Sequence, residues 1–225
     1  METYSIGNLL VQSMTDHASD DGAMVYILSY EPLDDEWLGM AAEHYGMNLA
    51  VISGMDWDND LTPWPAPGAP KGSPDFKGLA PQFLEYLQGT VMPLIEQRAG
   101  IGNPVRRVLV GVSLSGLFTL WAWMQNDFFT DIASISGSFW YRDFATWFTG
   151  LKFPEKKGMA YLSLGNKESH THVKAFRPVA VDTAAVVAAM RRAGINVVFQ
   201  MNEGNHYAPF YPRLKYALNA LFSKN

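Results

Sequence analysis

Short apolar runs alternate along the chain with longer stretches in which apolar residues recur at every third or fourth position. Uninterrupted apolar runs are typical of strands covered by helices on both faces, and the wider spacing is typical of amphipathic helices. The alternation therefore predicts an α/β fold, with a mostly parallel central sheet and helices on both faces. We expect strands at residues 24–28, 49–52, 108–112, 132–135, 159–164 and 197–201, and a further one around residues 9–11.

Helices are predicted from periodicity and from signals at their ends. Serine, proline and aspartate at residues 73–75 form a typical helix start, and apolar residues from Leu79 to Leu94 follow at spacings of three and four. Pro93 should kink or split this helix, because proline has no N–H to donate. Two later helices are expected at residues 182–193, where Gly194 closes the helix, and at residues 212–222.

The spacing of the predicted elements indicates one domain. Residues 61–74 contain five prolines and two glycines, which predicts a structured surface loop that is too short to link domains. The gap between the strands at 132–135 and 159–164 has room for one short helix, so no separate lid domain is expected. We therefore expect residues 1–225 to form a single domain.

The composition of the chain limits which partners it can bind and where in the cell it is expected. A content of 48% hydrophobic and 17% charged residues is typical of a globular protein. The formal net charge is −5 and there is no basic cluster, which argues against binding to nucleic acid. The absence of cysteine excludes disulfides and thiolate chemistry. No apolar run is long enough to span a membrane, and the first residues carry no signal peptide, so we expect a cytoplasmic protein. The oligomeric state is left open.

Residues 111–116 (GVSLSG) follow an apolar run and open an amphipathic stretch. A G-x-S-x-G sequence between a strand and a helix is typical of the nucleophile elbow of α/β-hydrolases, where small neighbours permit a turn sharp enough to expose the serine. Ser115 replaces the last glycine here, and Gly116 follows it. The motif predicts an α/β-hydrolase fold with Ser113 as nucleophile, although small residues are also common in ordinary turns between strands and helices.

A serine hydroxyl needs a base, and in α/β-hydrolases the acid and then the histidine follow the serine along the chain. His206 comes directly after the last predicted strand, so we expect it to be the base. Glu168, after the strand at 159–164, is the expected acid, and Asp182 is the alternative, although it resembles a helix cap. The other histidines are His17 and His44, before the serine, and His170 and His172, in a polar loop.

The oxyanion hole is expected to use the backbone N–H of Leu114 and one from the loop after residues 24–28, where Tyr30 is the candidate. Trp64 and Trp140 also follow predicted strands, at the sheet edge where such folds bind ligands. We therefore expect them to line an aromatic cleft, with packing as the alternative. Residues 56–60 do not continue as a calcium loop, so no metal is expected.

These features resemble the putative-esterase branch of the α/β-hydrolases, which includes siderophore esterases, S-formylglutathione hydrolases and feruloyl esterases. The matching segments are residues 60–64, 111–118, 136–140, 164–168 and 203–206. The resemblance implies an ester or thioester substrate, no cofactor, Ser113 as nucleophile, His206 as base and Asp60 near the substrate. Some siderophore esterases use a serine–histidine pair with a weak third member, and many relatives have a glycine-containing turn where this chain has Tyr30.

The sequence therefore predicts a serine hydrolase that cleaves a small-molecule carboxylic ester through an acyl-enzyme on Ser113. One alternative is acyl transfer to an alcohol or amine at the same site. The other is a catalytically silent hydrolase fold that only binds ligands, since fold alone does not establish activity.

Overall fold

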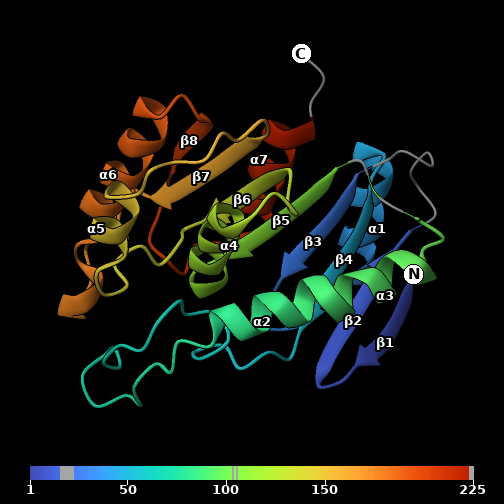
Figure 1. Cartoon of the computed structure of the whole chain (residues 1–225), viewed down its shortest axis with the longest axis horizontal. Coiled ribbons are helices and arrows are strands. Elements are labelled where there is room, and N and C mark those ends of the chain that lie inside the picture. The colour runs from blue at the N-terminus through green and yellow to red at the C-terminus, as the bar shows by residue number, and fades with distance from the viewer. Residues whose placement is uncertain (16–22, 103, 105, 223–225) are drawn as a thin grey trace.

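The protein, described here as a computed structural model, contains one eight-stranded sheet with the strand order β1-β2-β4-β3-β5-β6-β7-β8 (Figure 1). The structure describes residues 1–15, 23–102, 104 and 106–222. His17 lies outside these residues. The strands are β1 (Glu2–Ile6), β2 (Leu9–Met14), β3 (Met24–Leu28), β4 (Asn48–Ser53), β5 (Arg107–Val112), β6 (Asp131–Ile135), β7 (Met159–Gly165) and β8 (Asn196–Asn202).

The six strands from β3 to β8 are parallel to one another, as the uninterrupted apolar runs predicted. The strand expected around residues 9–11 is β2, which runs antiparallel to β4. The preceding strand β1 was not predicted, because its residues alternate and remain mostly exposed. It pairs with β2 through a two-residue turn at Gly7, whose φ of 61° favours glycine.

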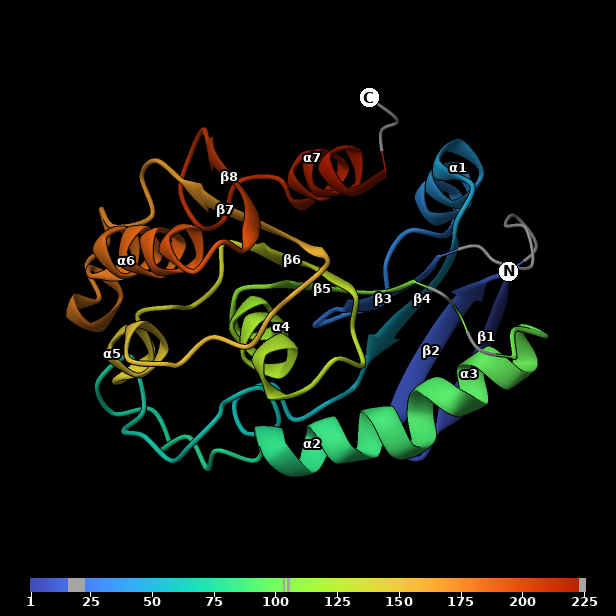
Figure 2. The same ribbon diagram turned by 45° about the horizontal axis from the view of Figure 1, so that its top comes forward.

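Helices cover both faces of the sheet, which confirms the predicted fold class (Figure 2). One face carries α1 (Asp35–Tyr45) and α7 (Phe210–Phe222), and the other carries the remaining helices. Alternate residues of each strand enter the two cores: Val25 and Ile27 face α1 and α7, and Tyr26 and Leu28 face the other layer. The remaining helices are α2 (Ala80–Tyr86), α3 (Met92–Arg98), α4 (Leu114–Gln125), α5 (Phe144–Thr149) and α6 (Val179–Arg192).

The predicted helix start at residues 73–75 is wrong. That segment belongs to a loop in which Phe76 forms a bridge with Ala66 and the Asp75 carboxylate accepts a hydrogen bond from the N–H of Gly68. Residues 73–75 are of the types that cap helices, but here the side chain of Asp75 closes a loop. The helix α2 begins only at Ala80.

The helix is split near Pro93, as predicted. A π-helical turn, Leu87–Val91, separates α2 from α3, and Pro93 lies in the first turn of α3. A proline is tolerated there because the first N–H groups of a helix have no partner within it.

The later helices lie close to where the sequence predicted them. α6 ends at Arg192, before Gly194 with a φ of 75°, and α7 begins two residues before Pro212. The single short helix α5 occupies the gap between β6 and β7. Among the described residues, no helix combines the length and apolar character that crossing a membrane requires.

Candidate active site

The strand order brings four chain segments to one edge of the sheet. β5, β6, β7 and β8 are consecutive parallel neighbours, so their carboxyl ends lie side by side. Ser113, Ser136, Glu168 and His206 each follow one of these strands within four residues. The carboxyl edge of an open parallel sheet is where such folds bind ligands.

Ser113 occupies the sharp turn between β5 and α4. Its φ of 60° lies in the left-handed region, which few residues other than glycine adopt, and it is held there by its surroundings. A Cβ at Gly111 would lie 2.2 Å from the carbonyl oxygen of Ser115, so only glycine fits at that position. The turn therefore depends on the small residues that the sequence motif contains.

Ser115, the departure from the usual motif, has its own structural role. Its hydroxyl accepts a hydrogen bond from the N–H of Val112 (2.8 Å) and lies 2.9 Å from the carbonyl oxygen of Leu28, to which it can donate. The side chain is fully buried. It thus ties the turn after β5 to the end of β3, which a glycine could not do.

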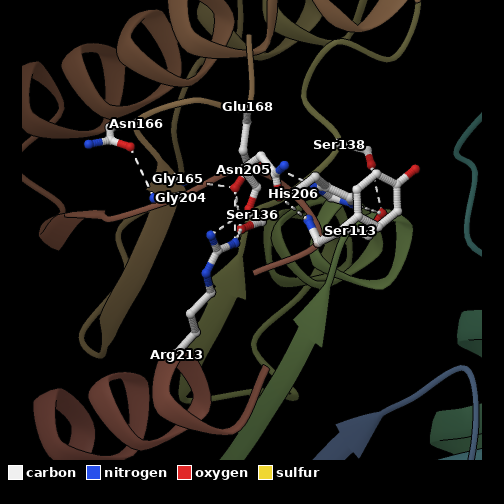
Figure 3. Close-up of polar contacts among 11 residues, drawn as sticks. Ser113, Ser136, Ser138, Gly165, Asn166, Glu168, Gly204, Asn205, His206 and Arg213 are labelled. Carbon is white, nitrogen blue, oxygen red and sulfur yellow. Dashed lines mark hydrogen bonds and ion pairs between the residues drawn. The ribbon is translucent and has the colours of Figure 1, made fainter. Parts of the chain in front are cut away.

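Three of the predicted residues form a hydrogen-bonded chain (Figure 3). The Oγ of Ser113 lies 3.0 Å from Nε2 of His206, and Nδ1 of His206 lies 2.8 Å from Oε2 of Glu168. An ionised carboxylate can only accept, so Nδ1 carries the proton when Glu168 is charged. In the neutral imidazole Nε2 is then free to accept from the serine hydroxyl.

Glu168 is held as a charged group although its side chain is only 2% exposed. Burial alone would raise the pKa of its carboxyl group, but hydrogen bonds from His206, Ser136 and the N–H of Gly165 outweigh burial and leave the pKa below its ordinary value. The carboxylate is therefore ionised at neutral pH and can orient the imidazole.

This lowered pKa predicts a pH dependence of stability. A carboxyl group whose pKa is lower in the folded state stabilises the fold above its unfolded pKa, near 4.5, and loses that contribution as the pH falls through its folded pKa. Urea unfolding of wild type and Glu168→Gln should therefore give a difference in unfolding free energy that shrinks below pH 4.5. A difference that stays constant through that range would contradict the assignment.

The hydrogen-bonded chain opens into a cavity of about 600 Å³. Ser113, Leu114 and Trp140 line it, together with the unpredicted aromatic side chains of Trp57 and Phe176. His170 and His172, which the sequence placed in a polar loop, also line the cavity, and that loop follows the carboxyl end of β7.

Trp64 and Asp60 were expected to contact substrate, and this needs correction because both lie outside the described cavity lining. The Nε1 of Trp64 donates to the carbonyl oxygen of Arg142, and its ring packs against Phe144 and Trp147. The carboxylate of Asp60 accepts from the N–H of Asp56 and so closes its own loop. Their side chains stabilise the loop before α2 and do not face the cavity.

The two expected oxyanion donors differ in their surroundings. Leu114 directly follows Ser113, opens α4 and borders the cavity. Tyr30 lies after β3, is 68% exposed and contacts Trp57 edge to face. Tyr30 is not among the described lining residues, so its backbone N–H remains a prediction.

Several polar residues at the site were missed from sequence. Ser138 is buried, and its Oγ lies 3.4 Å from that of Ser113. Ser136 and Arg213 are also buried and both contact Glu168. Ser136 and Ser138 lie in a segment noted only for its resemblance to relatives, and Arg213 looks like an ordinary helical arginine.

No group of three or more histidine, aspartate or glutamate side chains in the described part of the chain could hold a metal ion. The acidic residues at 56–60 hydrogen-bond to one another's backbone and to Asn59 instead.

Residues 32–213 match the family model Esterase, described as a putative esterase. The uncharacterized protein YbbA of Bacillus subtilis (strain 168) is 26% identical over 200 residues, which cover 84% of this chain and 80% of that protein. The match to the Esterase family model confirms the resemblance found in the sequence.

Solved structures share the fold. The siderophore hydrolase EstB from Aspergillus nidulans has a TM-score of 0.74 and 20% identity, covering 98% of this chain and 94% of that one. An IroE-like serine hydrolase from Shewanella oneidensis has a TM-score of 0.77 and 17% identity, covering 95% of this chain and 75% of that one. Because the family model spans most of its length, the chain belongs to this esterase family of the α/β-hydrolases and is an enzyme that hydrolyses esters.

Proposed function

We propose that the protein hydrolyses carboxylic esters or thioesters through an acyl-enzyme on Ser113, with His206 as general base and Glu168 as the acid that orients it. The observation that carries this proposal is the continuous chain of hydrogen bonds from Ser113 Oγ to His206 Nε2 (3.0 Å) and from His206 Nδ1 to Glu168 Oε2 (2.8 Å). The first distance allows direct proton transfer from the nucleophile to its base, and the second allows the carboxylate to orient the imidazole.

In the first half of the reaction, His206 removes the hydroxyl proton as Ser113 Oγ attacks the ester carbonyl carbon. The carbonyl oxygen becomes an anion beside the N–H of Leu114 at the start of α4, where the helix dipole also favours negative charge. The imidazolium then gives its proton to the leaving alcohol or thiol, and the acyl group remains on Ser113.

In the second half, His206 takes a proton from water, which attacks the acyl carbonyl and releases the acid. Glu168 stays ionised throughout and stabilises the imidazolium formed in both halves. Every proton in this scheme is held by a group of this chain, by the substrate or by the attacking water, and the proposal includes no cofactor.

The cavity supports a bulky substrate. Its volume of about 600 Å³ falls in the range of sites for molecules of drug size, and aromatic side chains such as Trp140 supply flat apolar walls. Two structures with this fold are named as siderophore hydrolases, so siderophore esters belong in a first substrate screen beside aryl and acetyl esters.

Acyl transfer from the same acyl-enzyme is the second candidate, because the cavity could admit an alcohol or amine in place of water. Polar residues such as Lys167, His170 and Thr171 also line the cavity and could contact either water or such an acceptor.

Aryl esters that share one acyl group and differ in leaving group test the proposal. A common acyl-enzyme predicts an initial burst of about one phenol per active site, followed by one kcat for all members. A kcat that follows the leaving group without any burst would contradict an accumulating acyl-enzyme. Added alcohols should leave the acid as the main product, and conversion mainly to a new ester would favour acyl transfer.

A further inference from the structure

We propose that Arg213 is a positioning residue that holds the acid and the base of the site in one arrangement. The proposal rests on the function proposed above and assigns a role to a side chain on α7 that does not touch the cavity. Arg213 is only 4% exposed, and an arginine is rarely buried without a partner. Figure 3 shows its side chain reaching from α7 toward Ser136 and Glu168.

The guanidinium group of Arg213 joins the two loops that carry the acid and the base. Its Nη1 donates to Oε1 of Glu168 (3.1 Å) and to Oγ of Ser136 (2.6 Å), and its Nη2 donates to the carbonyl oxygen of Asn205 (2.7 Å). Asn205 directly precedes His206. One rigid, planar group therefore fixes both the carboxylate and the backbone next to the imidazole, a geometry that the single ammonium of lysine cannot reproduce.

These contacts also decide which carboxylate oxygen faces the histidine. Oε1 of Glu168 accepts from Arg213, from Ser136 (2.7 Å) and from the N–H of Gly165 (2.7 Å). Three donors fill the acceptor positions of Oε1, so Oε2 is left to accept from Nδ1 of His206. The arginine thus sets the rotamer of Glu168 from the side away from the cavity.

The surrounding backbone is shaped to admit this guanidinium. A Cβ at Gly165 would lie 2.7 Å from Nη2 of Arg213 and 2.9 Å from Oε1 of Glu168. Ser136, between the two charged groups, has a φ of 50°, a conformation that costs energy for a residue other than glycine. The unfavourable φ of Ser136 and the close approach at Gly165 occur at the same point. They indicate that the fold maintains the contact of Arg213 with Glu168 at a local cost in free energy.

The test compares Arg213→Met and Arg213→Lys with Arg106→Met. Arg106 is a matched control because it bonds a carboxylate, Asp131 (2.8 Å), and a carbonyl of α7, Leu221 (3.0 Å), at the opposite end of β5 from Ser113. All variants are titrated with a fluorophosphonate, so that kcat is expressed per active site and unfolded protein is excluded.

We expect Arg213→Met to lower kcat about 100-fold with KM changed less than about threefold, and Arg213→Lys to recover part of the loss. Removing the positive charge favours protonation of the acid–base pair, so the acidic limb of the pH profile of kcat/KM should move to higher pH. Arg106→Met should lower only the thermal unfolding midpoint. If Arg213→Met does not fold, Arg213→Lys decides. Because lysine keeps the charge but not the planar group, we expect a lower kcat with little change in KM.

A double-mutant cycle tests most directly whether Arg213 acts through Glu168. If Arg213 acts through Glu168, Arg213→Met should lower kcat less than about threefold further in a Glu168→Gln background. Independent, multiplying losses would overturn the proposal, as would Arg213 variants with the kcat and pH profile of wild type. Failure of wild type itself to react would instead contradict the proposed function on which this role depends.

Discussion

Replacing Ser113 with alanine should lower kcat for ester hydrolysis about 10⁶-fold, as removal of the nucleophile does in serine hydrolases. The reason is that the hydroxyl of Ser113 is the one bonded to Nε2 of His206 in the part of the chain that the structure describes. The Oγ of the neighbouring Ser138 contacts that of Ser113 instead. The loss should appear in kcat, with substrate binding retained. Steady-state kinetics of the purified variant on an aryl ester measures it.

Ser134→Ala is the matched control for this variant. Ser134 is also a buried serine, and its hydroxyl donates to the carbonyl oxygen of Gly116 on the helix that follows the turn. Its removal should change kcat less than about threefold while lowering stability by about 1 kcal/mol. A Ser113→Ala variant that retains a tenth of the wild-type kcat would rule out Ser113 as the nucleophile.

Replacing His206 with alanine should lower kcat by a similar factor, about 10⁴- to 10⁶-fold, because the serine hydroxyl then has no base. The two losses should not multiply, since both variants stop the same proton transfer. The double variant should therefore be no slower than Ser113→Ala alone. His44→Ala serves as control, because His44 is exposed near the end of α1 and its ring contacts that of Tyr45 edge to face.

A His206→Ala variant within tenfold of wild type would contradict the role of base. His170 and His172 would then become the candidates, since both line the cavity. The same kinetic comparison on alanine variants of these two residues would show which one replaces it.

The parallel sheet was predictable because each of its central strands is a continuous apolar run buried on both faces. The hairpin of β1 and β2 was half missed because β1 is not an apolar run, although Gly7 and Asn8 after it are a recognised signal for a two-residue turn. The helix start at residues 73–75 failed for another reason. Residues that cap a helix also close loops, and only the long-range bridge between Ala66 and Phe76 distinguishes the two.

At the site, the sequence indicated the residues that closely follow strands, because the order of strands in the sheet fixes where such residues lie. Ser113, Glu168 and His206 each follow a strand, so strand order alone brings them together. Arg213 could not be found in this way, because its role depends on how α7 packs beneath β6 and β7. Trp64 failed because local sequence does not reveal whether an aromatic ring faces a cavity or a neighbouring helix.

The most direct test of the account is labelling of the folded protein with a fluorophosphonate, followed by intact-mass measurement and peptide mapping. The account predicts one adduct per chain on the peptide that contains Ser113. That adduct should be absent in Ser113→Ala and form far more slowly in His206→Ala. A folded wild-type protein that takes up no label, or takes it up at another residue, would contradict the acyl-enzyme mechanism.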